Sequence, residues 1–227
     1  MNKNKNSSLL QWGKAFLYTF LFLFMISITV LIYMVNLSYD LPTLDELKNF
    51  NPEQISKVIS ADGQVLHKLQ AVKKREVVKI GEIPQELIDA LIVMEDKEFY
   101  NHSGFSVRST LRAVIVNILM MKYKQGASTL TQQLARSMYE KISWKDRSIV
   151  RKIKELITAF NIEQTYTKSE ILELYLNSVF LGHGRYGVQS AAQLYFKKNV
   201  SDLNLDECAM LVGMLPAPNL YSPFRNL

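Results

Sequence analysis

Cysteine and histidine are scarce in this chain of 227 residues, and their scarcity excludes several kinds of site. The single cysteine, Cys208, has no partner in the chain for a disulfide and provides neither a CxxC redox motif nor a zinc-binding pair. The apolar residues around it predict a small buried side chain. The three histidines are His67, His102 and His183, and none lies four residues from another. A zinc enzyme is therefore disfavoured.

Positive charge is in only small excess outside the N-terminal segment. The chain has 27 Lys and Arg residues and 21 Asp and Glu residues, which gives a formal net charge of +6. The first three lysines precede residue 15, so the remainder of the chain carries +3. Proteins that bind nucleic acid usually present clustered basic surfaces. The composition therefore gives no support to a nucleic-acid partner.

One long apolar run lies near the N-terminus. Residues 15–35, AFLYTFLFLFMISITVLIYMV, contain no charge, and about 20 such residues cross a hydrocarbon core of roughly 30 Å as a helix. We predict a cytoplasmic tail over 1–14, a transmembrane anchor over 15–35 and a linker over 36–53. Lysines precede the run and acids follow it, which places the N-terminus in the cytoplasm. A cleaved signal peptide is the alternative, but its apolar region is usually about 7–15 residues long and ends in a small-x-small site, which is missing here.

Residues 54–227 are predicted to form one mainly helical domain. ISKVISADGQVLHKLQ alternates apolar and polar residues around Asp62-Gly63, which predicts a β-hairpin, and VVKI is a candidate third strand. After Pro84 the pattern is helical. An N-cap residue followed by an acid at the third helical position indicates helix starts at Ser143, Thr167 and Asn204. The expected fold class is mainly α with a small β-hairpin region.

A helix expected from about Trp144 to Thr165 has two distinct faces. Apolar residues at spacings of four, three, one and three form the predicted core face: Ile149, Ile153, Leu156, Ile157 and Phe160. A second row, at i, i+4, i+8 spacing, lies away from that face and consists of Arg147, Arg151 and Glu155, with Lys154 beside it. Periodicity alone favours a solvated ladder of ion pairs for this row.

Residues 111–123, LRAVIVNILMMKY, are apolar on nearly every side. This composition fits either a deeply buried helix or a segment that dips into lipid, and the segment is too short to cross a bilayer. Composition alone favours burial, whereas the nearby anchor favours lipid.

Carboxylates at the end of an apolar helix are the first candidates for chemistry. Residues 94–104, MEDKEFYNHSG, hold three acids directly after the run LIDALIV. Partial desolvation would make Glu95 a competent general base, but spacing alone does not rank it above Asp96 and Glu98. A surface acid at a helix terminus explains any one of them equally well.

Residues 125–136, QGASTLTQQLAR, are the second candidate. Gly126 permits close backbone approach, and hydroxyls at a helix start together with a basic residue form a natural anion site. The segment lacks the lysine ending of a phosphate-binding loop, so an ordinary capped helix also explains it. Separated acids, an Arg- and Lys-rich face and an apolar segment near a bilayer together suit a lipid-linked sugar pyrophosphate.

These stretches, in this order, resemble the peptidoglycan glycosyltransferases of glycosyltransferase family 51, which are monofunctional enzymes or N-terminal modules of class A penicillin-binding proteins. The similar stretches are MEDKEFYNHSG, QGASTLTQQLAR, RKIKE at 151–155, ILELYLN at 171–177 and GRYGVQSAAQLYFKK at 184–198. ISADGQVLHKL before them and LDECAMLVGMLPAPNLYSP after them extend the resemblance over about residues 55–223. It implies a lysozyme-like helical fold with an apolar jaw, over about 104–124, that lies on the membrane.

The resemblance also implies roles for individual residues. Glu95 would deprotonate the 4-hydroxyl of the acceptor sugar, and Glu155 would assist the donor pyrophosphate directly or through a metal. The leaving pyrophosphate would be stabilised by Arg136, Arg147, Arg151 and Lys154. Other substrate-binding residues would be Asp96, Phe99, His102, Gly126, Ser128, Thr129, Gln132 and Gln133. No cofactor is required with certainty, although Glu155 beside phosphates would suit Mg²⁺ or another divalent cation.

The implied reaction joins lipid II to a growing lipid-linked glycan through β-1,4 bonds and releases undecaprenyl pyrophosphate. The implied location is the bacterial cytoplasmic membrane, with the domain outside, and other cell-wall synthesis proteins are candidate partners. The resemblance turns the preferred reading of the Arg147 row from a solvated ladder to a cleft wall, and that of 111–123 from burial to lipid contact. A lysozyme-like lytic enzyme and a catalytically impaired assembly factor are the alternatives.

The chain departs from the family pattern at three positions. Ser106 stands where an aspartate is usual, Ser137 stands where asparagine is common, and Lys197 replaces a frequent glycine. These departures affect fine substrate contacts and leave both glutamates in place. The chain ends at Leu227, where the family usually continues, so we expect either a compact monofunctional enzyme or a shortened one.

Overall fold

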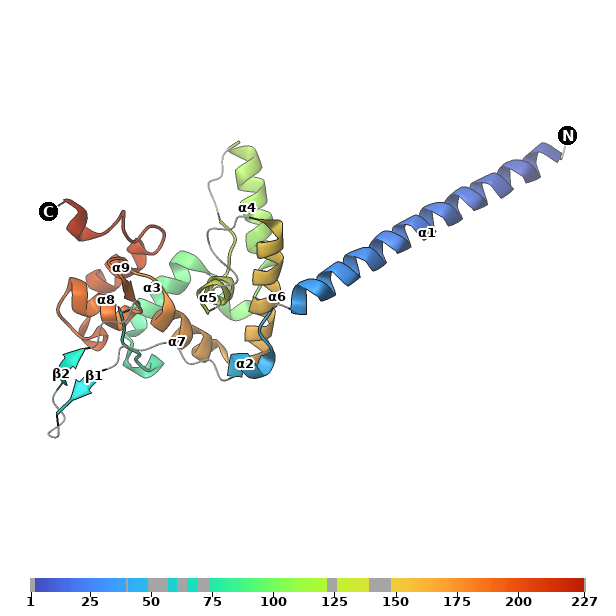
Figure 1. Cartoon of the computed structure of the whole chain (residues 1–227). Coiled ribbons are helices and arrows are strands. Elements are labelled where there is room, and N and C mark those ends of the chain that lie inside the picture. The colour runs from blue at the N-terminus through green and yellow to red at the C-terminus, as the bar shows by residue number, and fades with distance from the viewer. Residues whose placement is uncertain are drawn as a thin grey trace. The chain divides into compact units, whose positions relative to one another are not determined.

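The computed structural model describes residues 3–39, 41–48, 57–60, 65–68, 74–121, 126–138 and 148–226 (Figure 1). The chain divides into two compact units, Met1–Leu41 and Pro42–Leu227. Each unit is described by itself.

The first unit is a single long helix, α1 (Lys3–Tyr39). Its segment Trp12–Leu37 is long and apolar enough to cross a membrane, with a mean hydropathy of 2.5. The hydroxyl groups of Thr19 and Thr29 donate to the carbonyl oxygens four residues earlier, at 2.9 Å each, so these polar groups are satisfied within the helix. The helix runs through the predicted tail, span and part of the linker, and those three boundaries stay predictions.

The second unit is built mainly from helices, as the sequence predicts. The α-helices are α2 (Leu44–Lys48), α3 (Gln85–Glu95), α4 (Val107–Leu119), α5 (Leu130–Met138), α6 (Ile149–Thr165), α7 (Lys168–Ser178), α8 (Val188–Tyr195) and α9 (Leu205–Met214). Short 3-10 turns lie at Ile80–Glu82, Phe99–Asn101, Val200–Asp202 and Pro223–Asn226. The strands are β1 (Lys57–Ile59), β2 (Val65–Lys68), β3 (Lys74–Arg75) and β4 (Arg185–Tyr186).

The predicted hairpin is confirmed, but its proposed third strand is wrong. β1 pairs antiparallel with β2, and the turn at Asp62-Gly63 lies outside the described residues. VVKI, residues 77–80, forms no strand. Instead β3 pairs parallel with β4.

Side chains of α7 take the place of a strand partner for residues 77–80. The Val78 N–H donates to Asn177 Oδ1 at 2.9 Å, and Asn177 Nδ2 donates to the Val78 carbonyl at 2.8 Å. The Ile80 N–H donates to Glu173 Oε2 at 2.8 Å. Backbone polar groups need partners but not necessarily other strands, and an apolar tetrapeptide does not show which kind of partner it has.

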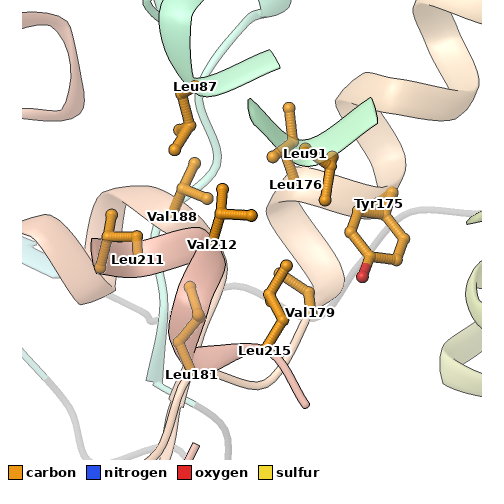
Figure 2. A pocket seen from close by; sticks show the side chains of 10 residues that line it. All are labelled: Leu87, Leu91, Tyr175, Leu176, Val179, Leu181, Val188, Leu211, Val212 and Leu215. Atoms are coloured by element: carbon orange, nitrogen blue, oxygen red, sulfur yellow. The ribbon is translucent and has the colours of Figure 1, made fainter. Parts of the chain in front are cut away.

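The hydrophobic core is formed by α3, α5, α6, α7, α8 and α9, and part of it lies between α3, α7, α8 and α9. Figure 2 shows apolar side chains from these helices pointing toward one another, with Leu91 of α3, Leu176 of α7 and Val212 of α9 among them. They leave a cavity of only about 10 Å³, so the packing is close. Cys208 on α9 is fully buried, as predicted.

Two of the three predicted helix starts are confirmed. Thr167 and Glu170 form a reciprocal capping box at the start of α7, and Asn204 and Glu207 form another at α9. The third candidate, Ser143, lies outside the described residues. The described part of α6 begins after Ser148, whose Oγ accepts from the Arg151 N–H at 3.1 Å.

The predicted core face of α6 is wrong. Ile149 is 80% exposed and Phe160 is 51% exposed, while the other three residues of that stripe are only partly buried. The buried residues of α6 are Glu155, Thr158, Ala159 and Ile162, and this side of the helix packs on α5. Gly104, before α4, allows its own backbone to approach α6 closely, because a Cβ at Gly104 would lie 3.0 Å from the Ala159 carbonyl oxygen.

Residues 107–121 are largely exposed, which contradicts the burial that composition alone favoured for 111–123. Ala113 is the buried residue of α4, whereas apolar side chains along the rest of the helix face outward. The exposed set is Val107, Leu111, Val114, Ile115, Ile118, Leu119, Met120 and Met121. The last two residues of the predicted segment lie outside the described ranges.

Candidate active site

The three neighbouring acids at the end of α3 have different partners. Asp96 is buried, and its Oδ2 lies 2.9 Å from His102 Nε2 and accepts from the Leu130 N–H at 3.0 Å. Leu130 is the first residue of α5, so Asp96 ties the loop after α3 to the start of that helix. The Asp96 carboxylate therefore has a structural role in this fold.

The Glu98 carboxylate likewise binds residues at the start of α4. Its Oε2 accepts from the Ser106 hydroxyl at 2.9 Å and its Oε1 accepts from Arg108 at 3.0 Å. Ser106 is also the N-cap of α4, because its Oγ accepts from the Ser109 N–H. The serine that departs from the family pattern therefore has a structural function here.

Glu95 is the last residue of α3 and remains partly open to solvent. Its Oε2 accepts a hydrogen bond from Gln133 Nε2 at 2.7 Å, across to α5. Gln133 Oε1 in turn accepts from the hydroxyl of Tyr175 on α7 at 3.0 Å. Of the three acids, Glu95 is the one whose position suits contact with a ligand.

Glu155 lies in a cluster of cations. The residue is only 1% exposed. Its Oε2 accepts from Arg151 at 2.6 Å, its Oε1 accepts from Lys152 at 3.0 Å, and an Arg136 nitrogen lies 3.6 Å from Oε1. A carboxylate is tolerated at this depth because opposite charges offset the cost of removing it from water.

Lys152 is central to this cluster, although the sequence analysis did not identify it as a site residue. Besides Glu155, its Nζ donates to Ser128 Oγ at 3.0 Å and to Gln132 Oε1 at 2.8 Å. Burial lowers the pKa of Lys152, and the charge of Glu155 opposes that shift. The i, i+3 spacing of Lys152 and Glu155 was the available signal. Lys154, which was predicted instead, lies about 100° around the helix from Glu155.

Helix α5 connects the two glutamates. Gln133 contacts Glu95, while Gln132 holds Lys152 and Arg136 lies beside Glu155. The charge of Arg136 also acts on both Lys152 and Tyr175. One short helix therefore carries side chains to both acids.

Several other predicted site residues are buried and bound to protein groups. The hydroxyl of Thr129 and the amide of Gln132 both donate to the Gly104 carbonyl, at 2.8 and 2.9 Å. The ring of Phe99 is fully buried, with Lys168 Nζ 4.4 Å from its centroid. Lys168 also donates to the His102 carbonyl at 2.6 Å. Gly126 is exposed, and Arg147 lies outside the described residues.

The described residues do not fit a divalent cation at Glu155. Both of its carboxylate oxygens already face cationic side chains, which repel a metal ion. Within the described ranges, no group of three or more His, Cys, Asp or Glu side chains is placed to hold one.

Comparison with known proteins places this arrangement in a family. A family model described as "Transglycosylase" matches residues 62–227. The chain belongs to the transglycosylase family. One curated relative is penicillin-binding protein 1A of Neisseria flavescens, which is 45% identical to this transglycosylase chain over 186 residues. The match covers 82% of this chain and 23% of that protein.

Other similar proteins carry the same description. Penicillin-binding protein 1A of Aquifex aeolicus (strain VF5) is 40% identical over 195 residues, covering 86% of this chain and 26% of that protein. The crystal structure of penicillin-binding protein 1A from Haemophilus influenzae matches at 27% identity with a TM-score of 0.37, covering 78% of this chain and 17% of that chain. The transglycosylase chain thus spans about a quarter of the length of its curated relatives.

Proposed function

We propose that the protein is a membrane-anchored peptidoglycan glycosyltransferase that polymerises lipid II into β-1,4-linked strands and releases undecaprenyl pyrophosphate. The family match supports the reaction class. The observation that carries the proposal is the pair of glutamates around α5, with a partly exposed Glu95 held by Gln133 and a buried Glu155 among three cations.

In this proposal Glu95 is the general base. It takes the proton from the 4-hydroxyl of the acceptor sugar, and that oxygen bonds to C1 of the donor sugar. The bond between C1 and the pyrophosphate oxygen breaks with inversion, and both electrons leave with undecaprenyl pyrophosphate. General-base assistance of this kind contributes typically about 10²–10⁴-fold to a rate.

The cations around Glu155 stabilise the leaving group. Arg136, Arg151 and Lys152 bring three positive charges against the one negative charge of Glu155, which leaves a net charge of +2 for phosphate oxygens. Arg151 Nε is buried and has no hydrogen-bond partner within the described part of the chain. Donors that are already oriented stabilise charge as it develops in the transition state.

The buried residues around the two acids act as positioning residues. Asp96 and His102 fix the loop after α3 against the start of α5. Thr129 and Gln132 hold α5 to Gly104, and Phe99 fills the core beneath the loop. We propose that the substrate contacts Glu95, Arg136, Arg151 and the side chains around them.

The exposed apolar surfaces of α4 and α6 support a lipid-facing role. Outward-facing Leu111 and Ile118 on α4, with Ile149 and Phe160 on α6, are costly in water and favourable at a membrane surface. A lipid-linked substrate has its pyrophosphate at that surface. With α1 as the anchor, we place the domain on the outer face of the cytoplasmic membrane, where other cell-wall synthesis proteins are candidate partners.

The alternatives explain less of the structure. A lysozyme-like lytic enzyme cleaves glycan without displacing pyrophosphate, so the cation cluster at Glu155 would have no function. A catalytically impaired assembly factor would not need Glu95 to be held in place. For the factor, Glu95→Gln would leave cellular function intact.

The direct test is polymerisation of purified lipid II by the full chain in vesicles. Glu95→Gln removes the base while keeping the shape of the side chain, so we expect turnover to fall by about 10²–10⁴-fold with lipid II binding retained. Asp89→Asn is the matched control, because Asp89 is an exposed acid on the same helix and should leave turnover unchanged. Wild-type turnover in Glu95→Gln, or product that shortens from polymer, would refute the proposal.

A further inference from the structure

A buried tyrosine holds the amide group that binds Glu95. Tyr175 is 3% exposed on α7, and its hydroxyl donates to Gln133 Oε1 at 3.0 Å. The other end of the same amide donates from Nε2 to Glu95 Oε2 at 2.7 Å. Three helices, α7, α5 and α3, are thus joined by one chain of two hydrogen bonds.

The direction of these two hydrogen bonds is fixed by the protonation states of Tyr175 and Glu95. Burial raises the pKa of Tyr175, and the nearby charge of Glu95 raises it further, so the hydroxyl keeps its proton and can donate. An ionised carboxylate can only accept. Gln133 must therefore turn its carbonyl to Tyr175 and its NH₂ to Glu95.

Without the hydroxyl, nothing at that end would select this orientation of the amide. A partly buried carbonyl oxygen left without a donor costs free energy, and the terminal torsion of glutamine has two nearly equivalent settings. The reversed setting would place an oxygen against the carboxylate and push it away. The effect on Glu95 would be a loss of position rather than a loss of any contact with substrate.

We propose that Tyr175 is a positioning residue for the reaction. Its hydroxyl sets the orientation of the Gln133 amide, and that amide holds Glu95 Oε2 so that Oε1 is presented to the acceptor hydroxyl. This inference rests on the proposed function, because it assumes that Glu95 is the base.

The test is Tyr175→Phe in the full chain with lipid II as substrate. Phenylalanine fills the same space, so we expect the melting temperature to stay within a few degrees of wild type. Misplacement of a catalytic group by a fraction of an ångström lowers a rate by about 10- to 100-fold, so kcat should fall by that factor while KM stays within about twofold. Tyr195→Phe is the matched control. It removes a hydroxyl that donates to the Leu181 carbonyl at 2.7 Å, and it should leave kcat unchanged.

A second variant separates positioning from general damage. Gln133→Met removes both hydrogen bonds, keeps the length of the side chain and should lower kcat at least as much as Tyr175→Phe. Because Tyr175 acts only through Gln133, the double variant should be no slower than Gln133→Met alone.

Three results would overturn the inference. They are an unchanged kcat in Tyr175→Phe, an unchanged kcat in Gln133→Met, and defects that multiply in the double variant. The outcome is separable from that of the proposed function. If Glu95→Gln abolishes turnover while Tyr175→Phe does not change it, only the proposed role of Tyr175 is refuted. If Glu95→Gln still turns over lipid II, the proposed function is refuted.

Discussion

Lys152 is a partly buried side chain that connects several residues of the site. Its ammonium group bridges Glu155, Ser128 and Gln132, which belong to α6 and to the start of α5. Removing a lysine from water favours its neutral form, while a neighbouring carboxylate favours the charged form. Burial has the larger effect here, so the pKa of Lys152 is lowered from 10.5.

This shift predicts an alkaline limit on turnover. As the pH rises through the lowered pKa of Lys152, a positive charge is lost beside the proposed pyrophosphate site, so the rate should begin to fall below pH 10.5. Lys152→Arg keeps the charge at every accessible pH and should move the alkaline limb of kcat upward. The measurement is the pH profile of lipid II turnover.

A suitable control for that profile is Lys79→Arg, because Lys79 is an exposed lysine. Its alkaline limb should coincide with that of wild type. If Lys152→Arg also coincides with wild type, Lys152 does not set the limit.

At the scale of single residues, the sequence did not distinguish among the candidate acids. Glu95, Asp96 and Glu98 are equivalent in spacing, and they are distinguished only by the partners that folding brings to them. Tyr175 lies within ILELYLN, yet no periodicity connects it with Gln133, 42 residues earlier. Hydrogen bonds between distant segments leave no local pattern in a sequence.

Among the elements, α6 departs most from its expected orientation. Its apolar stripe satisfies the usual pattern of an amphipathic helix, but Ile149 and Phe160 of that stripe are exposed, whereas Glu155, which pairs with Arg136 of α5, is buried. Hydrophobic periodicity identifies a helix and its two faces. It does not say which of the two faces is covered by the rest of the protein.

Two isoleucines on α6 provide a matched test of its orientation. Ile149 is 80% exposed and Ile162 is fully buried. Ile162→Ala should lower the free energy of unfolding by about 2–5 kcal/mol, because it leaves a cavity in the core. Ile149→Ala should change it by no more than about 0.5 kcal/mol. Thermal or denaturant unfolding of the full chain in detergent measures both, and a larger loss for Ile149→Ala would restore the predicted core face.

Helix starts were more predictable than helix orientation. The capping boxes at Thr167 and Asn204 each depend on residues only three apart, and both form as predicted. VVKI at 77–80 was misassigned because its partners, Asn177 and Glu173, lie more than 90 residues away. Helix caps between neighbouring residues can be predicted from a sequence, whereas hydrogen bonds between distant residues cannot.

The molecule as a whole combines a helix that is long and apolar enough to span a membrane with a helical transglycosylase unit. The class of the fold followed from composition and periodicity, and the family followed from ordered motifs. The relation between the two glutamates needed the structure, because α5 joins them through side chains of adjacent turns. One shared helix thus carries side chains to both glutamates.

Lipid II polymerisation by Glu155→Gln, with Glu163→Gln as control, tests whether α5 serves both glutamates. Both residues lie on α6, both are largely buried, and both pair with lysine, but Glu163 pairs with Lys168 away from the cation cluster. We expect Glu155→Gln to lose turnover by at least about 100-fold in a folded protein and Glu163→Gln to keep it within a few-fold. Equal turnover in the two variants would contradict this expectation.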